Sequence, residues 1–461
     1  MDNTSPDTSD DMSSSGAELR EGFTTGSALT AAAVAALRLL LRGAWPQVVS
    51  VPLPPFTIGV CDSWSSGYSV NAVAPAGWLD VPVAEAMLAS PLRAGSGAAL
   101  GVVIKDGGDD PDATHRARIE ALVECAPEGA ALPEHDTCLP GDDVPGTTDM
   151  PAAPGSSDIP GSSGSSGSSE LLLPLPGSGA SSPARPPYDG IIILLRGGKG
   201  VGRVTLPGLP VAVGEPAINP EPRRQLAFAM HRECAAAGWR GTVRVTARVP
   251  EGERIARHTL NPRLGIVGGI SILGTRGTVR PYSHDAWQAA VAQGLDVARA
   301  AGLTDVCLST GRRSETLLMR AYPTLPPLAF VQAADFAAFS LAAAAQRGFT
   351  RVAWGCFFGK LVKLAQGLPH THAHTAPLDL PLLARWASEA GAGTETSAAV
   401  ATANTAGQAL ELLLADPAHT AVLRAVAERA RHAAHGWTGG AESVTVSVHL
   451  FHMDGRCLVT A

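Results

Sequence analysis

A cationic, glycine-rich segment at residues 258–283 has the residue types best suited to chemistry in this chain. It reads HTLNPRLGIVGGISILGTRGTVRPYS, with five glycines, two prolines and no acidic side chain. Glycine at this density disfavours regular helices and strands, and it lets a ligand approach backbone N–H groups closely. The cations are Arg263, Arg276 and Arg280. A cationic loop of this kind indicates a site for an anionic ligand.

A second glycine-rich stretch, GGKGVG at 197–202, follows a predicted strand. The dinucleotide-binding fingerprint requires a helix after such a motif, whereas VTLPGLP, with its two prolines, follows here. The dinucleotide interpretation therefore fails for this loop. Two others stay open: a glycine-rich hairpin or bulge, and a ligand loop in which Lys199 and Arg203 bind carboxylates.

The sequence KDGGDDPD at 105–112 is an acidic turn whose spacing is not that of an EF-hand calcium loop. Aspartates are common in turns and at the start of helices, which is one interpretation. The other places a carboxylate beside a ligand, as a base or a hydrogen-bond partner, with Lys105 as a ligand contact.

Two shorter motifs also have a structural and a functional interpretation. FTTGS at 23–27 precedes an alanine-rich run, so its hydroxyls would cap a helix whose N-terminus also attracts anions. HTHAH at 370–374 follows a predicted helix and lies between Pro369 and Pro377, which indicates a loop. No cysteine or acidic ligand is grouped with these histidines, so we expect no metal site.

The overall composition indicates a globular protein of two domains. A chain of 461 residues is longer than one ordinary hydrophobic core can accommodate. Apolar residues make up 45% of the chain, and the net charge of −7 gives no reason to expect binding to nucleic acid or an anionic membrane. The seven cysteines include no C-x-x-C pair, which argues against disulfides and structural zinc and predicts reduced thiols in the cytoplasm.

Three segments differ from the rest in composition. Residues 1–17 are rich in serine, threonine and aspartate, which predicts a disordered tail. Residues 28–41 are apolar but shorter than a membrane span, and they include Arg38, so we predict a buried helix. Residues 127–189 are rich in proline, glycine and serine, which predicts a flexible insertion within the first domain.

The remaining elements predict two domains of different fold class within an α/β protein. In residues 18–283 strands and helices do not alternate regularly, which favours an α+β domain with a mixed sheet. Its strands are expected at 48–53, 99–104, 191–196 and 241–250. In residues 284–461 they alternate, which favours a Rossmann-like parallel α/β domain. Its elements are expected as helices 284–301, 335–347, 359–366, 379–391 and 397–435, the last broken near Pro417, strands 304–309, 327–332 and 350–355, and a terminal hairpin.

Five blocks of the sequence together resemble one known family. They are LREGFTTGSALTAAA (19–33), VIKDGGDDPDAT (103–114), GGKGVGRVTLPGLPVAVGEPAINPEPR (197–223), the segment 258–283 and GKLVKLAQG (359–367). In this order they resemble the CbiD family, the cobalt-precorrin-5B C1-methyltransferases of anaerobic cobalamin biosynthesis. The resemblance extends over residues 19–126 and 190–461.

The resemblance implies an S-adenosylmethionine-dependent C-methyltransferase that converts cobalt-precorrin-5B to cobalt-precorrin-6A by methylation at C1. The substrate would be a cobalt corrinoid rimmed with carboxylates, and neither nucleic acid nor membrane would be a partner. Substrate contacts are expected at Thr24, Thr25, Lys105, Lys199, Arg203, Arg223, Asn261, Arg263, Arg276 and Arg280. A carboxylate at Asp106 or Asp109 is expected to stabilise developing charge or to remove a proton.

The methyl donor is expected at the carboxyl ends of the parallel strands in the second domain. The candidate positions in those loops are Gly311, Asp335, Gly355, Gly359, Lys360 and His372. Two other functions stay open. A nicotinamide-dependent tetrapyrrole reductase is disfavoured because the domain's first strand lacks G-x-G-x-x-G. A non-catalytic corrinoid carrier stays open because the loops at 309–315 and 355–360 depart from the family's pattern.

Overall fold

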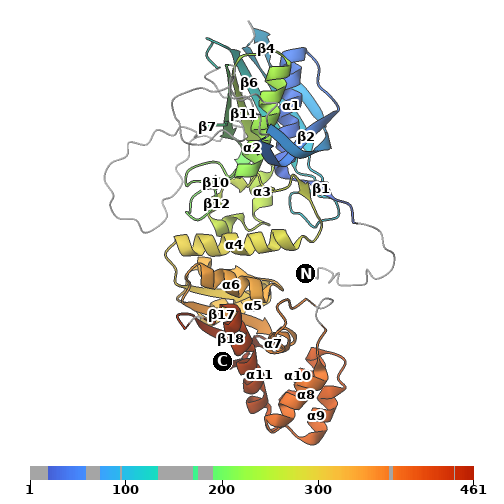
Figure 1. The fold of residues 1–461 in the computed structure, drawn as a ribbon, viewed down its shortest axis with the longest axis vertical. Helices are drawn as coiled ribbons and strands as arrows, with labels where there is room; N and C mark the ends of the chain where they lie inside the picture. Colours follow the sequence, from blue (N-terminus) through green and yellow to red (C-terminus); the bar gives the residue numbers. More distant parts are fainter. Residues whose placement is uncertain are drawn as a thin grey trace, which may run out of the picture.

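The computed structural model describes residues 19–58, 73–93, 96–132, 170–174, 190–372, 377–440 and 442–461. They form two units, stacked along the long axis of the molecule (Figure 1). Helix α4 (His284–Ala300) lies between them and packs against elements of both. The predicted tail at 1–17 falls outside the described residues.

The N-terminal unit is built on a six-stranded mixed sheet, as the irregular order of its predicted elements suggests. Its strands, in spatial order, are β4 (Glu85–Arg93), β5 (Ser96–Ile104), β6 (Arg118–Pro127), β11 (Gly241–Arg248), β8 (Ile191–Gly197) and β7 (Leu171–Leu172). Only the β11–β8 pair in this sheet is parallel. A separate hairpin of β2 (Val48–Ile58) and β3 (Val73–Pro82) lies beside it.

Helix α1 (Thr25–Arg42) is the central helix of this unit and packs against β5, β6 and helix α2 (Pro220–Ala236). The Thr24 hydroxyl caps it by accepting from the Ser27 N–H at 3.2 Å, and Gly43 ends it in the left-handed conformation (φ 71°). Its small alanines let strands and helix approach closely. Although α1 is long and apolar enough to cross a membrane, 78% of it is buried inside the protein, so it is a core helix as predicted.

The glycine-rich segments form short paired strands that tie distant parts of the chain together. These pairs are β1 (Gly22–Phe23) with β14 (Thr278–Val279), β9 (Gly200–Val201) with β13 (Gly269–Ile270), and β10 (Arg203–Val204) with β12 (Ile266–Val267). A Cβ on Gly269 would lie 2.1 Å from the carbonyl oxygen of Gly200. Glycine is required there because two backbones contact each other. The pairing of β9 with β13 is parallel, so it is not the predicted hairpin. Helix α3 (Gly252–Ala256) and a 3-10 helix (Asn261–Leu264) complete the segment.

The C-terminal unit contains a mostly parallel sheet with the order β16 (Phe330–Gln332), β15 (Asp305–Ser309), β17 (Arg351–Phe357), β18 (Thr445–Phe451) and β19 (Cys457–Thr460). Only β19 is antiparallel. Helix α5 (Arg312–Ala321) covers one face of the sheet. Helices α4, α6 (Ala337–Gln346), α7 (Phe358–Ala365) and α11 (His419–Trp437) lie on the other.

Two elements of this unit differ from their predicted form. The segment expected as a helix over 397–435 with a break near Pro417 forms α9 (Thr394–Ala401), α10 (Ala406–Leu414) and α11. The predicted break is the turn at Asp416 between α10 and α11, whereas the break before Thr405, which caps α10, was not predicted. The strand expected over 327–332 begins with a 3-10 turn (Pro327–Ala329), because proline has no N–H to donate to a neighbouring strand. With α8 (Leu380–Glu389), helices α9 and α10 form the far end of the molecule (Figure 1).

The predicted insertion at 127–189 is described only in part, because residues 133–169 and 175–189 lie outside the described ranges. Within it, residues 170–174 are described, and Leu171–Leu172 form the edge strand β7. Leu173 is buried, and its N–H donates to the carbonyl of Ile193 at 2.9 Å. Leu173 is therefore part of the N-terminal core and Leu171 packs against it, whereas Leu172 is exposed.

Candidate functional site

A cavity of about 260 Å³ lies where the N-terminal unit meets α4. The loops at 105–114 and 259–273, the start of α1 and the segment after β10 line it, and Ala290 and Gln293 of α4 close one side. Most of the wall is aliphatic. The polar side chains come chiefly from threonine and amide residues, with one lysine and one aspartate among the residues that line it.

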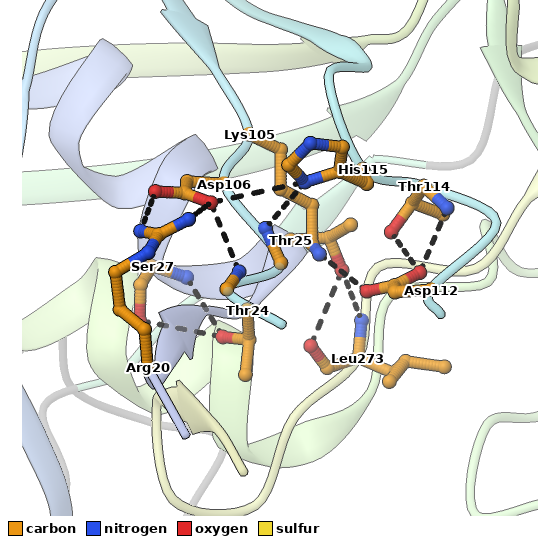
Figure 2. A network of polar contacts seen from close by, with 12 residues as sticks. Arg20, Thr24, Thr25, Ser27, Lys105, Asp106, Asp112, Thr114, His115 and Leu273 are labelled. Atoms are coloured by element: carbon orange, nitrogen blue, oxygen red, sulfur yellow. Dashed lines mark hydrogen bonds and ion pairs between the residues drawn. The ribbon is translucent and has the colours of Figure 1, made fainter. Parts of the chain in front are cut away.

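The lysine and the aspartate of this wall are Lys105 and Asp112, and they form an ion pair (Figure 2). The Lys105 side chain is 1% exposed and that of Asp112 is 21% exposed. Thr114 holds the opposite oxygen of Asp112, because its N–H and its hydroxyl both donate to Oδ1 at 2.7 Å. The aspartate is thus fixed from two sides at the edge of the cavity.

The chemistry of the pair follows from its surroundings. Burial by itself would raise the pKa of the Asp112 carboxyl, but the Lys105 ammonium and the Thr114 hydrogen bonds lower that pKa below its ordinary value. Asp112 is therefore a carboxylate at neutral pH. Within the described part of the chain, Asp112 is the only hydrogen-bond partner of the Lys105 ammonium. An ammonium has three N–H donors, so two remain for a ligand or for water.

Three predicted substrate residues also line the cavity, namely Thr24, Thr25 and Asn261. The Thr25 hydroxyl donates to the Leu273 carbonyl at 3.2 Å and accepts from the Leu273 N–H at 2.9 Å. Asn261 donates to the Gly269 carbonyl at 3.3 Å. These contacts hold the start of α1 against the glycine-rich segment, which is how two blocks far apart in sequence come to share one wall.

The two predicted catalytic aspartates lie near the cavity but not among the residues that line it. Arg20 contacts both oxygens of Asp106, and this hydrogen bonding lowers the pKa of Asp106 to about 2. Asp109 accepts from the backbone N–H of Arg20 at 2.7 Å. The carboxylate that faces the cavity is Asp112, in the same acidic turn. An Asp followed two residues later by Thr is an Asx-turn signal that could have singled it out.

Most of the predicted cationic contacts are engaged in pairs within the protein. Arg276 pairs with Asp285, Arg280 with Glu21 and Arg223 with Glu215, each at 2.8 Å, while Arg203 donates to the Gly214 carbonyl. Lys199 is held through its backbone carbonyl, which accepts from the Val249 N–H at 2.8 Å. Of the ten substrate candidates, Lys105 is the only cation that lines the cavity formed by the described residues.

Arg263 connects the two units. It donates to Glu315 in the first turn of α5 at 2.6 Å, and Gln332 at the end of β16 donates to the other oxygen of Glu315 at 2.8 Å. Glu315 is buried, with 4% exposure. The glycine-rich segment is therefore anchored to the carboxyl ends of two strands in the second unit. Sequence patterns gave no signal for this link.

The predicted donor residues cluster at that strand edge. Gly311 precedes α5. Gly355 is the register partner of Ser309, and the Leu318 side chain lies where a Cβ on Gly355 would be. Gly359 lies inside α7, where a Cβ would come within 3.2 Å of the Ala406 Cβ.

Two further donor candidates, Lys360 and Asp335, form an ion pair. The ammonium of Lys360 also donates to the Thr371 carbonyl at 2.9 Å. His372 follows in the same loop, and its carbonyl accepts from Lys363 at 3.0 Å.

The histidines of the HTHAH motif do not form a metal site in the described part of the chain. No group of three potential ligands is present among those residues, and His374 lies outside them. His370 instead stacks on His284 with ring centroids 5.2 Å apart and meets Phe336 edge-on at 4.8 Å. The motif is thus packed against the start of α4.

Comparison with known proteins supports one family over both units. The family model described as CbiD matches residues 12–73 and 182–281, and a second family model, described as CbiD, C-terminal domain, matches residues 370–461. A protein of Nitratidesulfovibrio vulgaris named cobalt-precorrin-5B C(1)-methyltransferase is 55% identical over 96% of this chain and 93% of its own length. Proteins of the same name from Geobacillus kaustophilus and Burkholderia pseudomallei are 37% and 36% identical, over 95% and 96% of this chain and 94% and 97% of their own.

A crystal structure of a cobalamin biosynthesis protein (cbiD) from Archaeoglobus fulgidus covers 75% of this chain and 79% of its own. With 21% identity and a TM-score of 0.30, it adds no argument about the fold. The sequence relationships are decisive without it, because they span nearly the whole chain at well above 30% identity. The chain belongs to the CbiD family of cobalt-precorrin-5B C(1)-methyltransferases.

Proposed function

We propose that this protein transfers a methyl group from S-adenosylmethionine to C1 of cobalt-precorrin-5B, giving cobalt-precorrin-6A. The observation that carries the proposal is 55% identity over 96% of the chain to a relative that bears this activity in its name. The geometry is compatible with it, since a cavity with a buried lysine lies beside a unit with a mostly parallel sheet.

We place the methyl donor at the carboxyl ends of β15 and β17. From β15 the chain proceeds to β16 on one side and then to β17 on the other, so the direction of winding changes between β15 and β17. This is the strand order of a Rossmann-like domain, and ligands of such sheets bind at the crevice where the winding reverses. Gly311 has open space around its Cβ position, which leaves room for a ligand at that crevice.

We place the corrinoid against the N-terminal unit, at the cavity that includes Lys105 and Asp112. In the reaction the S–CH₃ bond breaks and sulfur keeps its electron pair. The macrocycle supplies the pair for the new C–C bond and then loses a proton. A sulfonium donor needs little acid–base assistance, so the protein acts mainly by aligning the two carbons and excluding water.

The test is an assay of the purified protein with S-adenosylmethionine and cobalt-precorrin-5B. We expect equal amounts of S-adenosylhomocysteine and a corrinoid heavier by one methylene group. A parallel reaction with NADPH and no S-adenosylmethionine should leave the corrinoid unchanged. Reduction with NADPH would favour the reductase. Binding of the corrinoid without either reaction would favour the carrier.

We also propose that the domain boundary lies at residues 283 and 284. The Ser283 hydroxyl caps α4 by accepting from the Ala286 N–H at 3.3 Å, and everything beyond it belongs to the second sheet or its helices. A cytoplasmic location fits the free cysteines, of which four of the five described are buried.

A further inference from the structure

We propose that the cavity beside Lys105 is a subsite for one carboxylate-bearing arm of the corrinoid, and that Asp112 competes with that carboxylate for Lys105. The inference rests on the proposed function for the identity of the ligand. It goes beyond that function by assigning the cavity, its ligand group and a role for Asp112.

The size of the cavity excludes the macrocycle itself. Pockets that enclose drug-sized ligands measure about 300–1,000 Å³, and a corrinoid is larger than most such ligands. At about 260 Å³ this cavity can take a substituent but not a ring system. An acetate or propionate arm has the matching shape, because its methylenes would contact the aliphatic wall formed by residues such as Val204 and Ile266.

The charge of the ligand group follows from Lys105. Lys105 lines the cavity, and its buried ammonium has two N–H donors that no described residue accepts. Buried donors without partners are costly, so such donors normally meet water or ligand oxygens. A carboxylate would accept from both donors and make charge-assisted hydrogen bonds, which are roughly twice as strong as neutral ones.

Asp112 gives this subsite an unusual property. Its carboxylate orients the ammonium when the cavity holds no arm, but its negative charge would repel an incoming carboxylate. Thr114 fixes Asp112 in place, so the aspartate cannot simply swing away. Removing the charge of Asp112 while retaining its shape should therefore strengthen binding of the arm, whereas the loss of a binding residue would weaken it.

The cavity also links arm binding to the second unit. Gln293 and Ala290 of α4 form part of its wall, and α4 packs against α6 and β16 of the mostly parallel sheet. An arm seated here would fix the orientation of the macrocycle relative to the unit in which we place the methyl donor.

The test measures the equilibrium dissociation constant of cobalt-precorrin-5B by absorbance titration, without S-adenosylmethionine. Asp112→Asn should bind the corrinoid several-fold more tightly than wild type. The double variant Lys105→Gln/Asp112→Asn, which replaces the pair with two amides, should bind roughly tenfold or more weakly, as expected for the loss of one charge-assisted contact. Thermal melting of each variant confirms that it is folded.

Two controls show whether the effect depends on the cavity and on a carboxylate arm. Asp110→Asn removes a carboxylate from the same turn that does not line the cavity, and the new amide oxygen can still accept from the Tyr282 N–H, so it should leave the dissociation constant unchanged. A cobalt corrinoid whose peripheral carboxylates are all amides should respond to neither Lys105 nor Asp112 variants. Weaker binding by a folded Asp112→Asn variant, or an equal response of the amide corrinoid, would overturn the proposal. Neither result depends on methyl transfer, which is assayed separately.

Discussion

Each unit contains a lysine–aspartate pair, and the two pairs differ in how many N–H donors of the lysine remain without a partner among the described residues. In the N-terminal unit Lys105 pairs with Asp112, which accepts from Thr114. In the C-terminal unit Lys360 pairs with Asp335, which accepts from the Thr371 hydroxyl at 2.9 Å. In each pair, burial is opposed by the lysine and the threonine, and the pKa of the aspartate is lowered.

The difference lies in burial and in the second partner of the lysine. Lys105 is 1% exposed and contacts only Asp112 among the described residues, whereas Lys360 is 30% exposed and also donates to the Thr371 carbonyl. Lys363 adds a second ammonium to that same carbonyl at 3.1 Å. The C-terminal pair therefore acts as a clamp on the loop at 368–372, and the N-terminal pair keeps donors free toward a cavity. Similar residue types do not imply the same role.

The largest expected effect comes from removing each aspartate. Asp112→Ala leaves a buried ammonium without a counter-charge, which costs about 3–5 kcal/mol of unfolding free energy. Asp335→Ala leaves Lys360 close to solvent and bound to the Thr371 carbonyl, so the loss should be about 1 kcal/mol. Urea unfolding of both variants measures the difference. Equal losses would show that burial does not distinguish the pairs.

The second prediction concerns pH and compares a histidine from each unit. Burial lowers the pKa of His231, which is 2% exposed, from 6.5 to about 4, and it also lowers the pKa of the less buried His370. The folded state favours the neutral form of both histidines. The free energy of unfolding therefore has its full value above pH 6.5 and decreases as the pH falls toward the pKa of the folded state. For His231 the loss at pH 4 should be about 3 kcal/mol.

Urea midpoints between pH 4 and 7 test this expectation. His231→Gln should remove most of the decline on acidification, and His370→Gln should remove much less. A decline that is unchanged in the His231 variant would assign the acid sensitivity to other groups.

The third prediction compares a glycine beside the cavity with a glycine at the proposed donor site. Gly274 has φ +136°, and a Cβ there would lie 2.4 Å from the Thr24 side chain, so Gly274→Ala should cost about 1–3 kcal/mol. Gly311 has an extended backbone with open space around its Cβ position, so Gly311→Ala should be nearly neutral. Thermal melting of the two variants distinguishes them. A stable Gly274→Ala protein would mean that the wall around Thr24 adapts easily.

Sequence patterns predicted most of the elements but not the pairing of side chains. Runs of apolar residues located α1, β8 and β17, and alternating apolar residues located β11. The edge strand β7 was not foreseen, since three leucines within a serine-rich stretch have too short a pattern to reveal a partner strand. Likewise, the break near Pro417 in the helix expected over 397–435 was predicted, but the earlier break before Thr405, which caps α10, was not.

The candidate site shows the same limit of prediction from sequence. Lys105 and the two threonines of the FTTGS motif were candidates on residue type and block resemblance, and the fold places them along one cavity. Asp112 was passed over for Asp106 and Asp109, because four aspartates in one turn look alike until the fold shows which of them faces the cavity. Arg263 was identified as a cation, but its partner Glu315 lies in the other unit. Pairings of this kind depend on tertiary structure and leave no mark on local sequence.

The most direct test of the contrast between the two units compares two matched double variants, Lys105→Gln/Asp112→Asn and Lys360→Gln/Asp335→Asn. Each is assayed for the dissociation constant of cobalt-precorrin-5B and for melting temperature. We predict that the first binds the corrinoid roughly tenfold or more weakly, while the second melts at a lower temperature and binds the corrinoid as wild type does. Unchanged corrinoid binding in the first variant, or equal weakening in both, would contradict the account.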